Sequence, residues 1–334
     1  MSAIMTKEFV SIIMPVKNVE NYIKQCIDSV LNQTHREFEF IIVDDSADNT
    51  SKIIDSYNDR RIKHIIYKGN ISQALNYGIN SSNYDIVCRM DGDDYCTEDR
   101  IECQLNYLLT NKDKVDILGC NIVFLNSVNK EIMRKKYPEY NDEINFYMPI
   151  FTSLPHPTLM TYKSTLASVN YYDETQVVED LDLFLRLINK GCKFHNLQEY
   201  LYFYRYRKEI DFINQKNSEV NSHSYSLGKN YLSLYSKADN NLKNLRHALL
   251  EYYRGSMKNS RKYFHLYFKS NPAGFFRYFR YYSLSCLPQK LISGLRFLGI
   301  PQKINHFLLK CFKIEMLFLP LNREIKNNNK AKTN

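Results

Sequence analysis

Apolar runs rich in β-branched and aromatic residues alternate with segments of helical periodicity through the first part of the chain. The runs are 9–16, 38–45, 61–68, 84–91 and 115–125, and the helical segments between them are 20–31, 49–57, 71–81 and 99–109. Strands that alternate with helices in this way usually form one sheet that the helices cover. The pattern therefore predicts an α/β fold with a mostly parallel central sheet and flanking helices.

Acidic residues follow two of these runs, at the points where strands are expected to end. Asp44 and Asp45 close the second run, and Asp91, Asp93 and Asp94 follow the fourth. Because ligands bind at the carboxyl ends of strands in such sheets, the five carboxylates are expected to share one crevice. Like charges at this density repel one another. A divalent cation is the simplest compensation.

The ligand types narrow the choice of cation. Carboxylate oxygens suit Mn²⁺ or Mg²⁺ better than zinc. Two or three carboxylates leave the coordination shell incomplete, and such sites are usually completed by water and by the phosphates of a substrate. The sequence contains neither GxxxxGK[ST] nor GxGxxG, so no glycine-rich loop holds those phosphates. The acids therefore indicate a metal bridge to a nucleoside diphosphate.

Five segments, in this order along the chain, resemble the motifs of one enzyme family. They are SIIMPVKN, FIIVDDSADNT, NISQALNYGI, IVCRMDGDDYCTEDRIECQ, and HPTLMTY followed by YYDETQVVEDLDLFLRLINKG. The chain resembles the family-2 glycosyltransferases with a GT-A fold over residues 8–208. This resemblance implies that residues 1–210 are a catalytic domain, which transfers a sugar from a nucleotide-sugar donor to a hydroxyl acceptor with the help of a metal.

The resemblance implies roles for several residues at the strand ends. Pro15 and Val16 would line the nucleoside pocket, and Asp45 would contact the base. Asp91 and Asp93 form the DxD motif, which contacts the ribose and the metal in that family.

The sequence also departs from the family pattern. Asp94 extends the acidic run, as in many members, and is a candidate contact for donor or acceptor. The segment VDDSADNT is one residue shorter than the usual turn and lacks its glycine, which alters the expected contact with the base. Leu75 stands where many relatives have an arginine, so one phosphate or base contact is either missing or supplied from elsewhere.

A helix predicted over 177–191 carries acids in its first turn. Acidic side chains at a helix N-terminus stabilise the helix by about 0.3–1 kcal/mol, and this effect explains the presence of Asp182 without a catalytic role. The resemblance implies that the pair Glu179 and Asp180 supplies the catalytic base. We assign that role to Asp180 and treat Glu179 as a candidate substrate contact.

A carboxylate can remove the proton of the attacking hydroxyl, and a metal neutralises the departing diphosphate. One base and one metal suit a single in-line displacement, with inversion at the anomeric carbon.

Two further residues are candidates for substrate contacts. His156 lies between Pro155 and Pro157, near the predicted acceptor cleft, and is either a donor or acceptor contact or a structural histidine. Arg205 is either a solvated arginine at a strand edge or a ligand of the diphosphate, and Arg207 is its neighbour in the same basic segment.

The rear of the chain differs from the front in charge. Residues 211–334 contain 21 Lys and Arg against 6 Asp and Glu, whereas the first 210 contain 24 against 30. The region 211–321 is predicted to be helical, basic and rich in aromatic residues, with an apolar stripe in 303–319. Such helices can lie on an anionic membrane. The alternative is a helical subdomain that packs on the catalytic core. Nucleic acid is disfavoured because the acidic sheet edge would repel it, and the polar tail 322–334 is expected to be disordered.

Composition and the first residues bear on location. The eight cysteines include no CxxC pair, which argues against a zinc site or a disulfide framework. No basic start precedes an apolar run at the beginning of the sequence, and no apolar stretch reaches about 18 residues. We therefore expect a cytoplasmic protein, peripheral on the inner face of the plasma membrane if its rear binds lipid. The expected acceptor is a lipid-linked or growing surface polysaccharide.

Three other functions agree less well with the sequence. A sugar-phosphate nucleotidyltransferase shares the α/β layout and metal acids, but it needs a Gly-rich basic loop after the first strand, where this chain has MPVKNVEN. A glycosidase needs two carboxylates across the scissile bond and no metal. A catalytically degenerate scaffold is disfavoured because Asp45, Asp91, Asp93 and Asp180 are all present.

Overall fold

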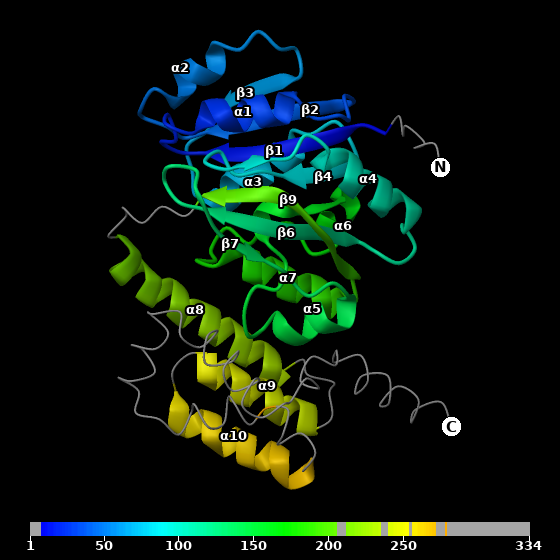
Figure 1. Cartoon of the computed structure of the whole chain (residues 1–334), viewed down its shortest axis with the longest axis vertical. Coiled ribbons are helices and arrows are strands. Elements are labelled where there is room, and N and C mark those ends of the chain that lie inside the picture. Colours follow the sequence, from blue (N-terminus) through cyan, green and yellow to red (C-terminus); the bar gives the residue numbers. More distant parts are fainter. Residues whose placement is uncertain (1–7, 206–211, 235–239, 254–255, 272–277, 279–334) are drawn as a thin grey trace. The chain divides into compact units, whose positions relative to one another are not determined.

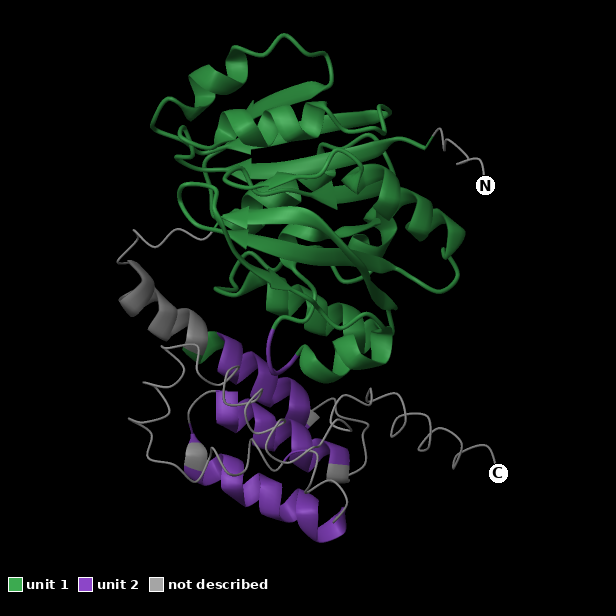
Figure 2. Cartoon of the chain, in the orientation of Figure 1, with its two compact units in different colours: residues 1–148, 152–223 green, residues 149–151, 224–334 purple. Residues whose placement is uncertain are grey.

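The chain was analysed as a computed structural model that describes residues 8–205, 212–234, 240–253, 256–271 and 278. It forms two compact units, one of residues 1–148 and 152–223 and the other of 149–151 and 224–334 (Figure 2). The predicted catalytic range, 1–210, falls in the first unit except for 149–151. Arg207, the apolar stripe 303–319 and the tail 322–334 lie outside the described residues.

The first half of the catalytic unit is a parallel sheet (Figure 1). Its strands are β1 (Val10–Val16), β2 (Phe38–Asp44), β3 (Ile62–Ile66) and β4 (Ile86–Arg89), and its helices are α1 (Ile23–Leu31), α2 (Thr50–Asp55), α3 (Ile71–Asn80) and α4 (Arg100–Thr110). The four strands pair in parallel, in the order β3-β2-β1-β4. All of these elements were predicted, with bounds within a few residues.

The second half of the unit contains both directions of pairing. Its strands are β5 (Tyr95–Cys96), β6 (Ile117–Leu125), β7 (Glu131–Lys135), β8 (Met160–Tyr162) and β9 (Phe194–Arg205), and its helices are α5 (Asn141–Tyr147), η1 (His156–Thr158), α6 (Lys163–Ala167) and α7 (Glu179–Lys190). β6 and β9 are parallel, whereas β8 runs antiparallel between β4 and β6. β5 and β7 also pair antiparallel, with β9 and β6. The α/β prediction is confirmed. Parallel pairing is limited to the four strands β1, β2, β3 and β4 and to the pair formed by β6 and β9.

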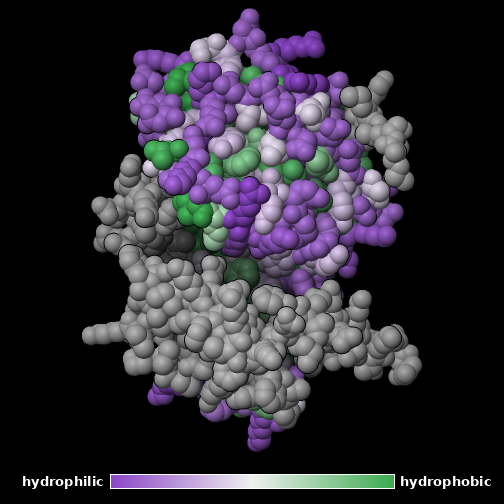
Figure 3. Space-filling model, in the orientation of Figure 1, coloured by the Kyte–Doolittle hydropathy of each residue, from purple (hydrophilic) through white to green (hydrophobic). Residues whose placement is uncertain are grey.

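Alternate residues of the central strands enter different layers of the core. Ile12 and Met14 of β1 belong to a buried cluster that includes residues of α1 and α4. Ile13, between them, faces α3, where a Cβ on Gly78 would come within 2.6 Å of its Cγ2 atom. Strands buried on both faces read as continuous apolar runs. The face of the first unit visible in Figure 3 is largely hydrophilic, with small hydrophobic patches.

The strand ends that carry the predicted site leave the sheet side by side. In register, Val16 of β1 lies opposite Asp44 of β2, and Ile13 lies opposite Arg89 of β4. Gly92 then passes so near β1 that a Cβ there would lie 2.5 Å from Val16 Cγ1. The glycine between the two acids of the DxD motif is therefore required by this close approach.

The described part of the second unit is largely helical, as predicted for this region. α8 (Phe212–Leu234) begins in the first unit and ends in the second, and α9 (Asn240–Tyr253) packs against α10 (Met257–Ser270). Phe264 and Tyr267 of α10 are buried, and the His247 and Tyr263 rings stack 4.9 Å apart. The described part of the basic region therefore has a packed core of its own. In the part of the chain that the structure describes, no helix is both long enough and apolar enough to cross a membrane.

Candidate active site

A pocket of about 230 Å³ lies at the carboxyl ends of β1, β2 and β4. It is lined by Pro15, Val16, Lys17, Val19, Val43, Asp45, Gly69, Asn70, Ile71, Ala74, Asp91, Gly92 and Asp93. The predicted donor and metal residues other than Arg205 are among them. Apolar walls with a few polar groups are typical of small-molecule sites. The structure thus brings these residues together, and their individual contacts with a donor stay predictions.

Lys17 is a pocket residue that the sequence analysis missed. Its Nζ lies 2.5 Å from Asp45 Oδ2, and the two side chains are 65% and 19% exposed. An ion pair this exposed contributes little, so Lys17 can turn to another anion at small cost. Leu75, at the position where many relatives have arginine, is buried. Among the residues that line the pocket, Lys17 is the cation in a position to replace that arginine.

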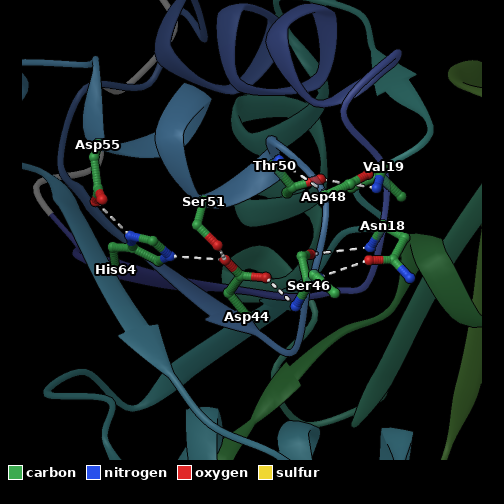
Figure 4. Close-up of polar contacts among 10 residues, drawn as sticks. Asn18, Val19, Asp44, Ser46, Asp48, Thr50, Ser51, Asp55 and His64 are labelled. Carbon is green, nitrogen blue, oxygen red and sulfur yellow. Dashed lines mark hydrogen bonds and ion pairs between the residues drawn. The ribbon is translucent and has the colours of Figure 1, made fainter.

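Asp44 serves the loop rather than the pocket (Figure 4). Its buried carboxylate accepts hydrogen bonds from Ser46 N (2.8 Å), Ser51 Oγ (2.5 Å) and His64 Nε2 (3.1 Å). Burial by itself would raise the pKa of Asp44, but these donors lower it below its ordinary value. The expectation that five carboxylates share one crevice is therefore corrected, because Asp44 points to the far side of its strand.

Side-chain hydrogen bonds take the place of the missing glycine in the turn after β2. Asn18, at φ +53°, accepts from Ala47 N (2.8 Å) through Oδ1, and its own N–H donates to Ser46 Oγ (2.9 Å). Val19 N donates to Thr50 Oγ1 at 2.9 Å. These bonds fasten the loop after β1 to the loop after β2 (Figure 4). Both loops contribute to the pocket, so its wall is fixed without the usual turn residue.

Arg89 is the positive group among the acids after β4, and the sequence analysis missed it too. Its guanidinium binds Asp91 through two contacts, of 2.8 Å and 3.0 Å, with side-chain exposures of 5% and 23%. Burial would lower the pKa of Arg89, but the charge of Asp91 raises it above its ordinary value. Bidentate pairing fixes the orientation of a carboxylate. Asp91 is therefore held in place by the residue at the end of its own strand.

Asp94 is not among the residues that line the pocket. It is buried, and its Oδ1 accepts a hydrogen bond from Arg205 N at 2.7 Å. Burial raises the pKa of Asp94 well above its ordinary value, and the charges of Asp93 and Asp91 raise it further. Asp94 thus joins β9 to the acidic loop. Its assignment as a substrate contact stays a prediction.

Arg205 is buried rather than solvated. Its guanidinium donates to Gln25 Oε1 (2.6 Å), to Asn129 Oδ1 (2.9 Å) and to the carbonyl oxygen of Asp93. These bonds anchor the DxD segment to α1 and to the β6–β7 turn. Contact with a diphosphate stays a prediction, and it would have to compete with them.

The donor set fits a metal that is shared with a substrate. Within the described ranges, no group of three or more His, Cys, Asp or Glu side chains is arranged to hold a metal. Asp91 and Asp93 both line the pocket. Two carboxylates suit Mg²⁺ or Mn²⁺ only if water and phosphate oxygens complete the shell. The residues present therefore fit a cation that is bound together with a nucleoside diphosphate.

The acidic start of α7 lies within electrostatic reach of the DxD motif. Burial raises the pKa of Glu179 to about 7, and the charge of Asp180 contributes to the rise. Burial also raises the pKa of Asp180, whose Oδ1 accepts from Leu181 N at 2.7 Å. The positive charge of Arg89 lowers both pKa values, and the negative charge of Asp91 raises them. The charges of Asp91 and Arg89 thus act on the pair that the sequence assigned to catalysis.

His156 connects this pair to the loop before α7. The imidazole is buried, its Nε2 lies 2.7 Å from Tyr172 Oη, and its Nδ1 lies 3.9 Å from Glu179 Oε1. Burial and the charge of Arg89 lower the pKa of His156 well below its ordinary value, so the ring is neutral. A structural role is therefore visible, and a substrate contact stays a prediction.

Comparison with known proteins identifies the family. Residues 11–168 match the model described as Glycosyl transferase family 2. The O-antigen biosynthesis glycosyltransferase WbnJ of Escherichia coli is 35% identical over 205 residues, covering 59% of this chain and 80% of WbnJ. The chain belongs to glycosyl transferase family 2. A second relative of this family-2 glycosyltransferase, also from Escherichia coli, is the UDP-Gal:alpha-D-GlcNAc-diphosphoundecaprenol beta-1,3-galactosyltransferase. It is 29% identical over 231 residues, which cover 65% of this chain and 82% of the relative.

Solved structures share the fold of this glycosyltransferase. The crystal structure of S. aureus TarS 1–349 in complex with UDP-GlcNAc aligns with a TM-score of 0.56 at 16% identity, covering 83% of this chain and 79% of the TarS 1–349 chain. The mannosyltransferase PcManGT from Pyrobaculum calidifontis, in complex with GDP-Man and Mn²⁺, aligns with a TM-score of 0.51 at 13% identity, covering 86% of each chain. The predicted fold class and the prediction of a glycosyltransferase are both confirmed.

Proposed function

We propose that this glycosyltransferase moves a sugar from a nucleotide-sugar donor to a hydroxyl group of a lipid-linked or growing surface polysaccharide, with inversion and with Mn²⁺ or Mg²⁺. The relatives named for O-antigen biosynthesis and for a diphosphoundecaprenol acceptor support this acceptor class. The neighbours bound to UDP-GlcNAc, and to GDP-Man with Mn²⁺, support the donor and the metal.

One observation carries the proposal: Arg89 acts on both halves of the site. It holds Asp91 on the wall of the donor pocket, and its charge also acts on Glu179 and Asp180 at the start of α7. A group that removes a hydroxyl proton must work close to the bond that the donor loses. This proximity of pocket and acid pair is the arrangement that transfer requires.

The residues of the site would have separate roles in the reaction. Lys17 and Asp45 would contact the nucleoside, and Asp91 and Asp93 would hold the metal together with the donor's phosphates. When bound, the metal offsets the negative charge that develops on the leaving diphosphate. Asp180 would accept the proton of the acceptor hydroxyl.

Asp180→Asn tests the base. Asn is nearly isosteric but accepts no proton, so donor binding should persist while transfer falls by about 10²–10⁴-fold. A thermal-shift screen of nucleotide sugars with Mn²⁺ or Mg²⁺ first identifies the donor, since a ligand of the native state raises its stability. Asp182→Asn is the matched control, because Asp182 is in the same helical turn but pairs with Arg186 at 2.8 Å. A loss of transfer below about tenfold in Asp180→Asn would assign the base elsewhere.

We also propose that the rear of the chain attaches the enzyme to the inner face of the plasma membrane. The excess of Lys and Arg in 211–334 and the apolar stripe of 303–319 support this attachment. Each cation near an anionic leaflet contributes roughly 1 kcal/mol. Replacing Lys303, Lys310 and Lys313 by Gln should therefore weaken co-sedimentation with anionic vesicles by roughly a hundredfold. If the unmodified protein fails to co-sediment even at low salt, the rear is a packing subdomain instead.

A further inference from the structure

The first turns of α3 touch both the donor pocket and the loop that leads into α7. Gly69, Asn70 and Ile71 line the pocket. Asn70 also caps the helix, because its side chain accepts from Gln73 N at 2.9 Å. The same side chain donates through Nδ2 to the carbonyl oxygen of Glu174 at 2.9 Å. One residue of the pocket wall is thus bonded directly to a segment about a hundred positions away in the sequence, which is too far for local structure to explain.

The side chain of Asn76, nearly two turns further along α3, binds the backbone of the same loop. Its Oδ1 accepts from Tyr172 N at 3.0 Å, and its Nδ2 donates to Tyr172 O at 2.9 Å. Nδ2 also donates to Glu174 Oε1 at 3.0 Å. The amide therefore pairs with Tyr172 as a neighbouring strand would, satisfying both of its backbone groups.

The backbone just before Tyr172 is strained. Asn170 and Tyr171 both have φ +58°, in the left-handed region that non-glycine residues rarely adopt. Asn tolerates this region, but for a bulky residue such as Tyr171 it persists only where the surroundings dictate it. Tyr171 N donates to Leu166 O at 2.9 Å, and the two bonds from Asn76 begin at the next residue, so the constraint comes from both sides of the strained position.

The clamped loop continues into the acid pair. Tyr172 Oη lies 2.7 Å from His156 Nε2, and His156 Nδ1 lies 3.9 Å from Glu179 Oε1. Tyr172 and His156 are both buried. A continuous set of packed contacts therefore runs from α3, on the wall of the donor pocket, to the start of α7.

We propose that Asn70 and Asn76 are positioning residues, which fix the segment Tyr172–Glu174 against the donor pocket and thereby hold the acid pair where the acceptor hydroxyl must arrive. The inference rests on the proposed function for its consequence in transfer. The link between α3 and the loop is itself a property of the free protein. A purely structural role would lower stability without separating donor binding from turnover.

Two variants break the link in different ways. Asn76→Asp keeps the acceptor for Tyr172 N and loses both Nδ2 donors. Asn70→Ser keeps a capping oxygen, since Ser caps helices about as well as Asn, but its side chain is too short to reach Glu174. Asn58→Asp is the control for added charge, because Asn58 is exposed on the loop before β3.

Amide hydrogen exchange of the segment 171–178 is the first readout, with and without UDP and Mn²⁺. We expect exchange in the free protein to rise by at least about tenfold in both variants, because local opening becomes easier. The affinity for UDP with Mn²⁺ should change much less. With the donor that the screen identifies, kcat should fall by roughly a hundredfold at similar KM, as a displacement of about 1 Å can cause. Asn58→Asp should leave all three quantities as in the unmodified protein.

The outcomes separate the link from the proposed function. Unchanged exchange of 171–178 in both variants overturns the inference, whether or not UDP binds. A fall in UDP affinity as large as the fall in kcat also overturns it, because the asparagines would then act on the donor itself. If the unmodified protein binds no UDP with Mn²⁺ while exchange rises in the variants, the link is supported and the choice of donor is wrong.

Discussion

Replacing Arg89 by Met would remove the charge that joins the two halves of the site. Breaking a buried ion pair usually costs about 3–5 kcal/mol, because the partner is left without compensation. Two features place this pair at the low end of that range. Asp91 is 23% exposed at the pocket, so water can solvate it. Arg89 Nε is buried without a hydrogen-bond partner, a penalty that Met removes. We therefore expect the free energy of unfolding to fall by about 3 kcal/mol, measured by urea titration at neutral pH.

The same substitution should shift the pH dependence of transfer. The charge of Arg89 lowers the pKa of Glu179 and of Asp180, since a nearby cation favours the ionised carboxyl. Without that charge, the pKa of Glu179 should rise above about 7 and that of Asp180 should rise with it. The base must be ionised to accept a proton, so more of the enzyme would be inactive at neutral pH. The acid limb of the kcat/KM profile should therefore move to higher pH.

Arg89→Lys separates the two effects. Lys keeps the charge but not the bidentate geometry. Its acid limb should lie near that of the unmodified enzyme, while its stability should stay lowered. If the limb of Arg89→Met coincides with that of the unmodified enzyme, Arg89 does not act on the acid pair. If both variants unfold at the original urea concentration, the pair with Asp91 contributes nothing to stability.

Three other substitutions test the pocket and the loop after β2. Asp93→Ala should abolish Mn²⁺-dependent binding of a nucleoside diphosphate in calorimetry without unfolding the protein, and equal affinity in both proteins would remove Asp93 from the metal site. Asp44→Asn should lower the free energy of unfolding at pH 7 by about 1–3 kcal/mol, because its donors lose a charged acceptor. Since the folded pKa of Asp44 is depressed, its contribution is present above the unfolded value of about 3.9 and is lost as pH falls through the folded pKa, so the two proteins should converge in acid. Gly92→Ala should weaken UDP binding by an amount equivalent to about 1–3 kcal/mol, because the added Cβ would meet Val16, and unchanged affinity would show that the loop yields freely.

The parallel half of the fold could be predicted because its signals are local. Each strand of β1–β4 is a short apolar run, and a helical segment of its own follows each of the first three. In the second half of the unit, β6 gave a comparable signal as the run 115–125, but the other strands did not. β5 and β8 have only two and three residues, too few for a period to appear. β9 is longer, but irregular register against β6 interrupts its alternation. These strands are determined by the partners they reach, which depend on the tertiary fold.

The same distinction applies to the site. Asp45, Asp91 and Asp93 could be placed at one sheet edge because the carboxyl ends of parallel strands must meet there. Asn76 and Tyr172 could not be paired, because they are 96 positions apart and neither stands in an acidic or basic cluster. Arg89 stands two positions before Asp91 and could have been recognised as the counterion of the acids.

The ion pairs change the argument for the metal. Repulsion among the acids led us to predict a metal cation. The chain supplies side-chain cations instead, because Lys17 contacts Asp45 and Arg89 contacts Asp91. Arg205 binds the loop that carries Asp93. The acids therefore need no metal for compensation until a donor brings further negative charge in its two phosphates. We accordingly expect Mn²⁺ and the donor's nucleoside diphosphate to bind together.

A thermal-shift experiment with each ligand alone and with both tests this order. A ligand that binds only the native state raises its stability as RT ln(1 + [L]/Kd). Independent binding would make the two shifts add, whereas shared coordination makes the joint shift exceed their sum. Mn²⁺ alone should produce little shift, because Asp91 is already committed to Arg89. In Arg89→Met that commitment is gone, and Mn²⁺ alone should then bind more tightly. If Mn²⁺ alone gives the full shift in the unmodified protein, the ion pair does not govern the metal, and the acids form a cation site of their own.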